Sequence, residues 1–190
     1  SSAASDVYKR QGKYNMKFWS VQTKNVMEII QEEGRYQPDF QKSNYLKKLP
    51  HMEELYHFIL KSFNRNNGMN LPGVLFGFAG STGDRICEIE SIDVFRAFMK
   101  NRKRAIESLW KQLFQEDTVV FELDYELDFN PHFIDINDFQ FIMPPITIVE
   151  PYTELSIDRI LEDIHLGRIS PSEFPSYVIQ AHLPYITREN

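Results

Sequence analysis

Residues 18–39 read FWSVQTKNVMEIIQEEGRYQPD, a strand signal followed directly by a helix signal. Residues 17–22 are rich in side chains that favour β-strands, and Thr23 is a suitable N-cap for a helix over 24–33. The apolar side chains of that helix recur with helical spacing. Gly34 stands where a left-handed C-terminal cap is expected. The stretch therefore predicts a strand and helix that end at this glycine.

Outward from this unit, hydrophobic patterns predict more helices and strands. A turn at residues 81–84 joins two of the strands as a hairpin. The strands and helices do not alternate strictly, which favours an α+β fold over a parallel doubly wound one. We expect one compact domain, with a mixed or antiparallel split sheet flanked by helices. The expected helices cover 50–64, 91–115 and 156–167, and the expected strands cover 73–80, 85–90, 117–127 and 172–186.

The length of 190 residues and the 42% hydrophobic content are sufficient for one globular domain with a real core. Residues 1–15 have no apolar periodicity and resemble translated adapter sequence from metagenomic assemblies. We therefore interpret them as a non-native or disordered segment, with the globular domain over 16–190. The final residues stop without a natural cap, and we interpret the C-terminus as truncated.

Composition excludes several classes of protein. The net charge of −6 argues against nucleic acid as the main partner, and the basic run at 100–104 is typical of a solvated helix face. Cys87 is the single cysteine, which excludes an internal disulfide and a cysteine-rich zinc site, and its alternating strand context predicts a buried structural thiol. No apolar run approaches the ~20 residues of a membrane span. A cytoplasmic protein without membrane contact is the expectation.

Motifs for common chemistries are absent from the sequence. The glycines of residues 77–85 lack the lysine of a phosphate-binding loop and favour a hairpin turn. The five histidines have no metal-ligand spacing, so we expect no metal. The densest acidic group surrounds His132 and includes Asp138, a pattern that Asn/Asp-rich turns share with acid–base sites.

Aromatic residues gather around the first predicted helix: Trp19, Tyr36, Phe40 and Tyr45. An aromatic wall with a few polar groups suits a flat heterocycle such as nicotinamide or adenine. Packing in a core explains aromatic residues equally well. Both interpretations stay open on the sequence.

The chain from residue 16 onward resembles a bacterial and phage family of proteins that is defined only as a domain of unknown function. FWSVQ at 18–22, GRYQPD at 34–39 and INDFQFI at 136–142 carry the resemblance. A similar start, Trp-Ser/Thr-x-Gln, occurs in that family. The resemblance covers most of the predicted domain and implies no assigned activity.

A more distant resemblance is to ADP-ribosyltransferase-like folds, which open with a strand, a short connection, a helix and a glycine. In those folds a polar residue at the end of the first strand holds NAD, and Ser20 or Gln22 stands near that place here. Gln180 stands near the position of their catalytic glutamate. This is a departure, because an amide lacks the charge that stabilises an oxocarbenium ion.

Three interpretations follow from this resemblance. In the first, the chain is an NAD-using transferase that modifies a macromolecule. Trp19 and Tyr36 would sandwich nicotinamide, Gln22 would bond its ribose or amide, and Asp39 or Asp138 would supply the carboxylate.

The other two interpretations involve no catalysis. In the second, the fold binds a nucleotide or a modified base. In the third, it is an accessory or inhibitor protein of a phage or other mobile element that binds a host or phage protein. The apolar stretch at 141–152, FIMPPITIVEPY, is the candidate docking surface for that partner.

Overall fold

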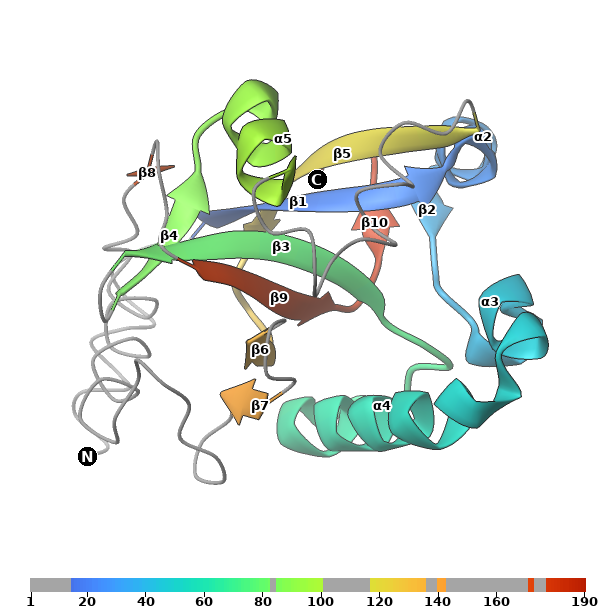
Figure 1. Ribbon diagram of the computed structural model, residues 1–190. Coiled ribbons are helices and arrows are strands. Elements are labelled where there is room, and N and C mark those ends of the chain that lie inside the picture. The colour runs from blue at the N-terminus through green and yellow to red at the C-terminus, as the bar shows by residue number, and fades with distance from the viewer. Residues whose placement is uncertain (1–14, 83–84, 101–116, 136–139, 143–170, 173–176) are drawn as a thin grey trace.

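A curled eight-stranded sheet lies at the centre of the protein, with helices around it (Figure 1). The computed structural model describes residues 15–82, 85–100, 117–135, 140–142, 171–172 and 177–190. Its helices are α2 (Lys24–Glu33), α3 (Asn44–Lys48), α4 (Glu53–Asn67) and α5 (Ile92–Lys100), with 3-10 turns η1 (Phe40–Lys42) and η2 (Pro50–Met52). Its strands are β1 (Asn15–Thr23), β2 (Arg35–Tyr36), β3 (Leu75–Thr82), β4 (Arg85–Ile89), β5 (Thr118–Glu126), β6 (Phe133–Asp135), β7 (Gln140–Ile142), β8 (Pro171–Ser172), β9 (Tyr177–Leu183) and β10 (Ile186–Thr187).

The sheet is mixed, and the fold is α+β as the sequence predicts. Its strands follow the order β5-β1-β3-β9-β6-β7, and β4 pairs with both β3 and β8. The β4–β8 pair is parallel, whereas the other pairs are antiparallel. A separate two-stranded sheet joins β2 to β10. Strands that are far apart in the sequence therefore lie side by side.

Local sequence signals account for β1 and α2. Gly34 ends the helix with φ of 80°, and its N–H donates to the carbonyl oxygen of Ile30, which confirms the predicted left-handed cap. Thr23 occupies the N-cap position in an extended conformation, but its side chain makes no capping bond. The first helical N–H group, that of Lys24, donates instead to the carbonyl of Asp117 at 2.7 Å.

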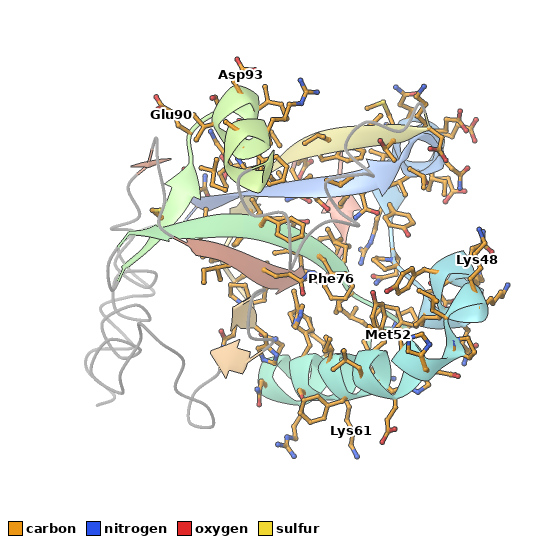
Figure 2. All side chains as sticks on the ribbon, in the orientation of Figure 1. Lys48, Met52, Lys61, Phe76, Glu90 and Asp93 are labelled. Atoms are coloured by element: carbon orange, nitrogen blue, oxygen red, sulfur yellow. The ribbon has the colours of Figure 1, made fainter. Side chains whose placement is uncertain are left out.

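The main core joins the sheet to α2 and α4. Of the strand residues, Phe18, Leu123 and Leu183 are fully or almost fully buried, and α4 contributes Ile59 and Phe63. Figure 2 shows Met52 and Phe76 in the space between the sheet and α4, whereas Lys61 points away from the sheet. Burying this much apolar surface is the dominant favourable term in folding.

Aromatic rings continue through the core next to α4. Each ring lies 5.2–6.2 Å, between centroids, from the next one, a separation typical of favourable ring contacts. The contacts run from Tyr45 through Tyr56, Phe76, His182, His132, Phe63, Phe129 and Tyr125 to Phe18. Core packing therefore accounts for many of the aromatic residues in this region.

A second, smaller cluster lies under α5. Phe95 from α5 stacks on Trp19 at 5.8 Å and contacts Phe78 at 6.1 Å, between ring centroids. The three rings are buried but do not belong to the main core. Cys87 is also buried, as the sequence predicts for a structural thiol.

Some predictions fall outside the described residues. These are Asp138, the predicted helix at 156–167, and the predicted docking stretch at 141–152 apart from its first two residues. The predicted helix at 91–115 is described as α5 up to Lys100. The interpretation as an accessory protein that docks through 141–152 therefore stays a prediction.

Candidate functional site

A cleft of about 510 Å³ opens between α5 and the strands β1 and β5. We call it the Trp19 cleft. Its size falls within the range of small-molecule sites, which span roughly 300–1,000 Å³. It is lined by Trp19, Glu90, Ser91, Ile92, Arg96, Val120 and Glu122.

Trp19 forms a rigid floor for the cleft. The side chain is 3% exposed, and its Nε1 donates a 2.8 Å hydrogen bond to the carbonyl of Ile89. Its ring stacks on Phe95 with an interplanar angle of 13°. Both the indole N–H and one ring face are therefore occupied by the protein. A ligand in the cleft would contact a fixed apolar surface at this point, together with Ile92 and Val120.

One side of the cleft combines groups of both signs, because Asp93 lies in the first turn of α5 and Glu90 directly precedes Ser91. The first turn of α5 lies on this side, and Ser91 caps it. Oγ of Ser91 accepts from the N–H of Val94 at 3.3 Å, and the carbonyl of Ser91 accepts from the N–H of Phe95 at 2.9 Å. A helix N-terminus carries partial positive charge. Arg96, exposed on the same helix, adds a full positive charge. Arg96 and this N-terminus favour an anionic group such as a phosphate, whereas the carboxylate of Asp93 in the same turn opposes one.

Carboxylates gather around one lysine beside the cleft. Nζ of Lys17 lies 3.3 Å from Oε1 of Glu122 and donates to the carbonyl of Glu90 at 3.5 Å. Glu88 accepts from the backbone N–H of Lys17 at 3.1 Å. Burial raises the pKa of Glu88, although Lys17 opposes the shift. Glu90 and Glu122 remain at the cleft as acceptors for hydroxyl or amide donors.

Ser20 and Gln22 point away from this cleft. Alternate residues of a strand face opposite sides, so the side chains of both lie on the side of β1 opposite to Trp19. Oγ of Ser20 donates to the carbonyl of Phe76 at 2.7 Å, and Nε2 of Gln22 donates to Oγ of Ser20 at 2.9 Å. The two predicted NAD contacts thus form a polar chain to the backbone of the sheet.

Tyr36 and Asp39 also lie elsewhere. Tyr36 pairs with Ile186 in the two-stranded sheet and packs against the main core. Burial and the neighbouring carboxylate of Asp39 raise the pKa of its hydroxyl. Asp39 caps η1 by accepting from the N–H of Gln41 at 3.0 Å. Neither residue lines the Trp19 cleft, so the structure does not bring Tyr36 to Trp19 as a sandwich.

Gln180 shares a face of the sheet with Trp19. Trp19 pairs with Phe78, and Phe78 pairs with Gln180 on the next strand. Two strand spacings separate the first residue from the third, or roughly 10 Å. Gln180 is therefore on the correct face but outside the cleft lining.

The sequence interpretation missed Arg96, Glu90 and Glu122. A signal for Glu122 exists, because the strand 117–127 alternates apolar and polar residues. The pairing of Trp19 with Glu122, which brings this carboxylate to the cleft, joins residues that are about 100 positions apart in the chain. Nothing local in the sequence specifies that pairing.

The expectation of no metal stays a prediction. Within the described ranges, no group of three or more His, Cys, Asp or Glu side chains is arranged to hold a metal ion. His132 and His182 are neighbours, with ring centroids 6.2 Å apart, next to Phe63 and Phe76. Nε2 of His132 lies within hydrogen-bond distance, 3.0 Å, of the side-chain amide nitrogen of Asn66. The pair is part of the aromatic packing.

No helix in the described part of the chain has both the length and the apolar character needed to cross a membrane.

No family model, no curated protein and no solved structure matches the sequence or the fold.

Proposed function

We propose that this domain binds a nucleotide of the NAD type in the Trp19 cleft. The observation that supports the proposal is the combination of surfaces in one cleft. Apolar side chains, a helix N-terminus with Arg96, and the carboxylates of Glu90 and Glu122 all line the same cleft. A nucleotide presents matching groups: a flat ring, ribose hydroxyls and phosphates.

Each part of the ligand has a partner in this arrangement. The nicotinamide or adenine ring lies against Ile92 and Val120, next to the buried ring of Trp19, because a rigid apolar surface favours a flat ring. The phosphates lie near Arg96 and the first turn of α5, where charge-assisted hydrogen bonds form. The ribose hydroxyls donate to Glu122, a role that an ionised carboxylate fills.

ADP-ribose transfer extends this proposal. In such a reaction the glycosidic bond between ribose and nicotinamide breaks, and nicotinamide leaves with the bonding electron pair. The acceptor nucleophile forms a new bond to the ribose and loses its proton. A carboxylate near the ribose stabilises the oxocarbenium-like transition state. Glu122 is the carboxylate for this role, since Gln180 has no charge to offer.

Calorimetry with the full chain tests the binding step. NAD and ADP-ribose are titrated into the native protein, Arg96→Ala and Arg65→Ala. Arg65 is an exposed arginine on α4, away from the cleft lining, and serves as the matched control. Loss of one charge-assisted contact predicts about tenfold weaker binding for Arg96→Ala. Equal affinity of the two variants, or no heat with either ligand, contradicts the proposal.

Nicotinamide release tests the transfer step separately. The native protein and Glu122→Gln are incubated with NAD and with DNA, RNA or protein acceptors. We expect release by the native protein and at least a hundredfold slower release by the variant, the range found for losing one electrostatic contact to a transition state. If NAD binds but nicotinamide is not released, the domain binds a nucleotide and the transferase proposal is wrong.

A further inference from the structure

A cluster of positive charge lies at the corner formed by η1, α3 and η2, which we call the basic corner (residues 40–52). Its lysines Lys42, Lys47 and Lys48 are exposed, and His51 lies beside them. Residues 40–52 contain three Lys and no Arg, Asp or Glu, a net charge of +3, whereas the whole chain has −6. The remainder therefore carries −9. Positive charge is concentrated in one part of an acidic protein.

The basic corner is held in place by its own caps and anchors. Ser43 accepts from the N–H of Leu46 at 3.2 Å and so caps α3. Leu46 and Phe40 are buried in the main core. Since both anchors are fixed, the lysines project from a defined backbone. Figure 2 shows Lys48 at the outer side of α3, away from the sheet.

Tyr45 adds an exposed aromatic ring to the corner. Its side chain is 41% exposed, and one face stacks on Tyr56 with centroids 5.7 Å apart and an interplanar angle of 29°. Tyr56 in turn packs against Phe40 and Phe76. The ring is thereby supported from the core side while much of it faces solvent.

We propose that the basic corner binds single-stranded nucleic acid, with phosphates on the three lysines and one base stacked on Tyr45. Proteins that bind single strands combine a positive surface along the backbone with aromatic rings on which bases stack. Both components are present here within the seven residues 42–48. A base in a duplex is already stacked and paired, so an exposed ring favours the single strand.

The charge distribution distinguishes this partner from a basic or neutral one. Between Asp39 and Glu53 the chain has no acidic residue, so a polyanion meets no repulsion within the corner. The acidic remainder repels a polyanion and confines the contact to this corner. This is compatible with a protein whose net charge argues against coating nucleic acid, because the contact is short.

Fluorescence anisotropy with labelled 12-nucleotide DNA and RNA tests the proposal on the full chain. Three lysine–phosphate contacts predict that the logarithm of affinity falls with the logarithm of salt concentration with a slope of about −2, since each contact contributes about −0.7 on a single strand. Lys47→Glu/Lys48→Glu should reduce that slope to about −0.7 or abolish binding. The matched control Lys61→Glu/Arg65→Glu makes the same change of charge on α4 and should retain the slope. Lys61 points away from the sheet in Figure 2, and Arg65 lies four positions further along, on the same helix face.

The base-stacking component has its own variants. Tyr45→Leu should weaken binding about fivefold or more, and Tyr45→Trp should retain it, because stacking of one base has an effect of at least this size. Circular dichroism melts establish that each variant is folded. Three results would overturn the proposal. The two charge-reversed variants could lose the same amount of affinity, or Tyr45→Leu could bind as tightly as the native protein. An acidic peptide could also bind more tightly than either oligonucleotide.

Discussion

The regions under α4 and α5 use aromatic rings for different purposes. Under α4, rings from one helix, three strands and the loop between β5 and β6 are continuous with the main core. Under α5, the second cluster consists of Trp19, Phe78 and Phe95, and a cleft with four charged or polar side chains opens beside it. The α4 region is continuous with the main core, while the α5 region holds a small helix against the sheet beside the cleft in which we propose that a ligand binds.

The largest expected effect belongs to the α4 region. Phe63 is fully buried and contacts Phe129 and His132, so Phe63→Ala leaves a cavity in the main core. We expect the free energy of unfolding to fall by about 4 kcal/mol. Urea denaturation measures the change. Phe58→Ala on the same helix is the control, because that side chain is 52% exposed and we expect a loss below about 1 kcal/mol.

Phe95→Ala is the corresponding change under α5. We expect a loss of about 3 kcal/mol, at the lower end for a buried phenylalanine, because α5 can detach locally and limit the damage. The same variant should lose ligand binding, since α5 carries Ser91, Ile92 and Arg96 of the cleft. Denaturation and calorimetry on one sample measure both. The opposite result would be a folded Phe63→Ala variant that does not bind the ligand and a Phe95→Ala variant that does. It would assign ligand binding to the α4 region and not to the α5 region.

The pH dependence of the free energy of unfolding is a third test, and it addresses the α4 region. Burial lowers the pKa of His132 to about 4 and that of His182 to about 3, with a further contribution to the latter from His132. Unfolded histidines titrate near 6.5, so below that pH the unfolded state binds protons that the folded state does not. Stability is therefore greatest above pH 6.5 and falls as the pH decreases toward 4. Between pH 6.5 and 5.5 we expect a loss of about 1 kcal/mol for each histidine.

The measurement is urea denaturation at pH 7.5, 6.5 and 5.5. His182→Gln should remove about half of the pH dependence, whereas His57→Gln, an exposed residue of α4, should leave it unchanged. If the two variants had the same pH dependence as the native protein, the buried pair would not be its source.

Local signals in the sequence were sufficient for much of the fold. The strand and helix of residues 15–33, the cap at Gly34 and the hairpin of β3 and β4 were predicted because each depends on side chains within a few positions of one another. The pairings of β1 with β5 and of β3 with β9 were not predicted. They depend on contacts between distant segments, which one sequence does not reveal.

The candidate site shows the same limit more sharply. Trp19 and Gln22 were predicted to share a ligand, yet three positions along a strand place two side chains on opposite faces. Strand alternation alone separates them. Placing Arg96 and Glu122 beside Trp19, however, requires knowing that α5 and β5 meet at β1. Tertiary packing provides that information.

The smallest expected effect on stability belongs to Glu122→Gln, and it is the most informative about the cleft. The carboxylate is 54% exposed and pairs with Lys17 at 3.3 Å, so the variant should lose less than about 1 kcal/mol of unfolding free energy. If thermal melts of this variant match the native protein while NAD binding weakens, stability and ligand recognition are separated at a single side chain, as the comparison of the two regions requires. A large loss of stability would instead make the Lys17 pair part of the fold.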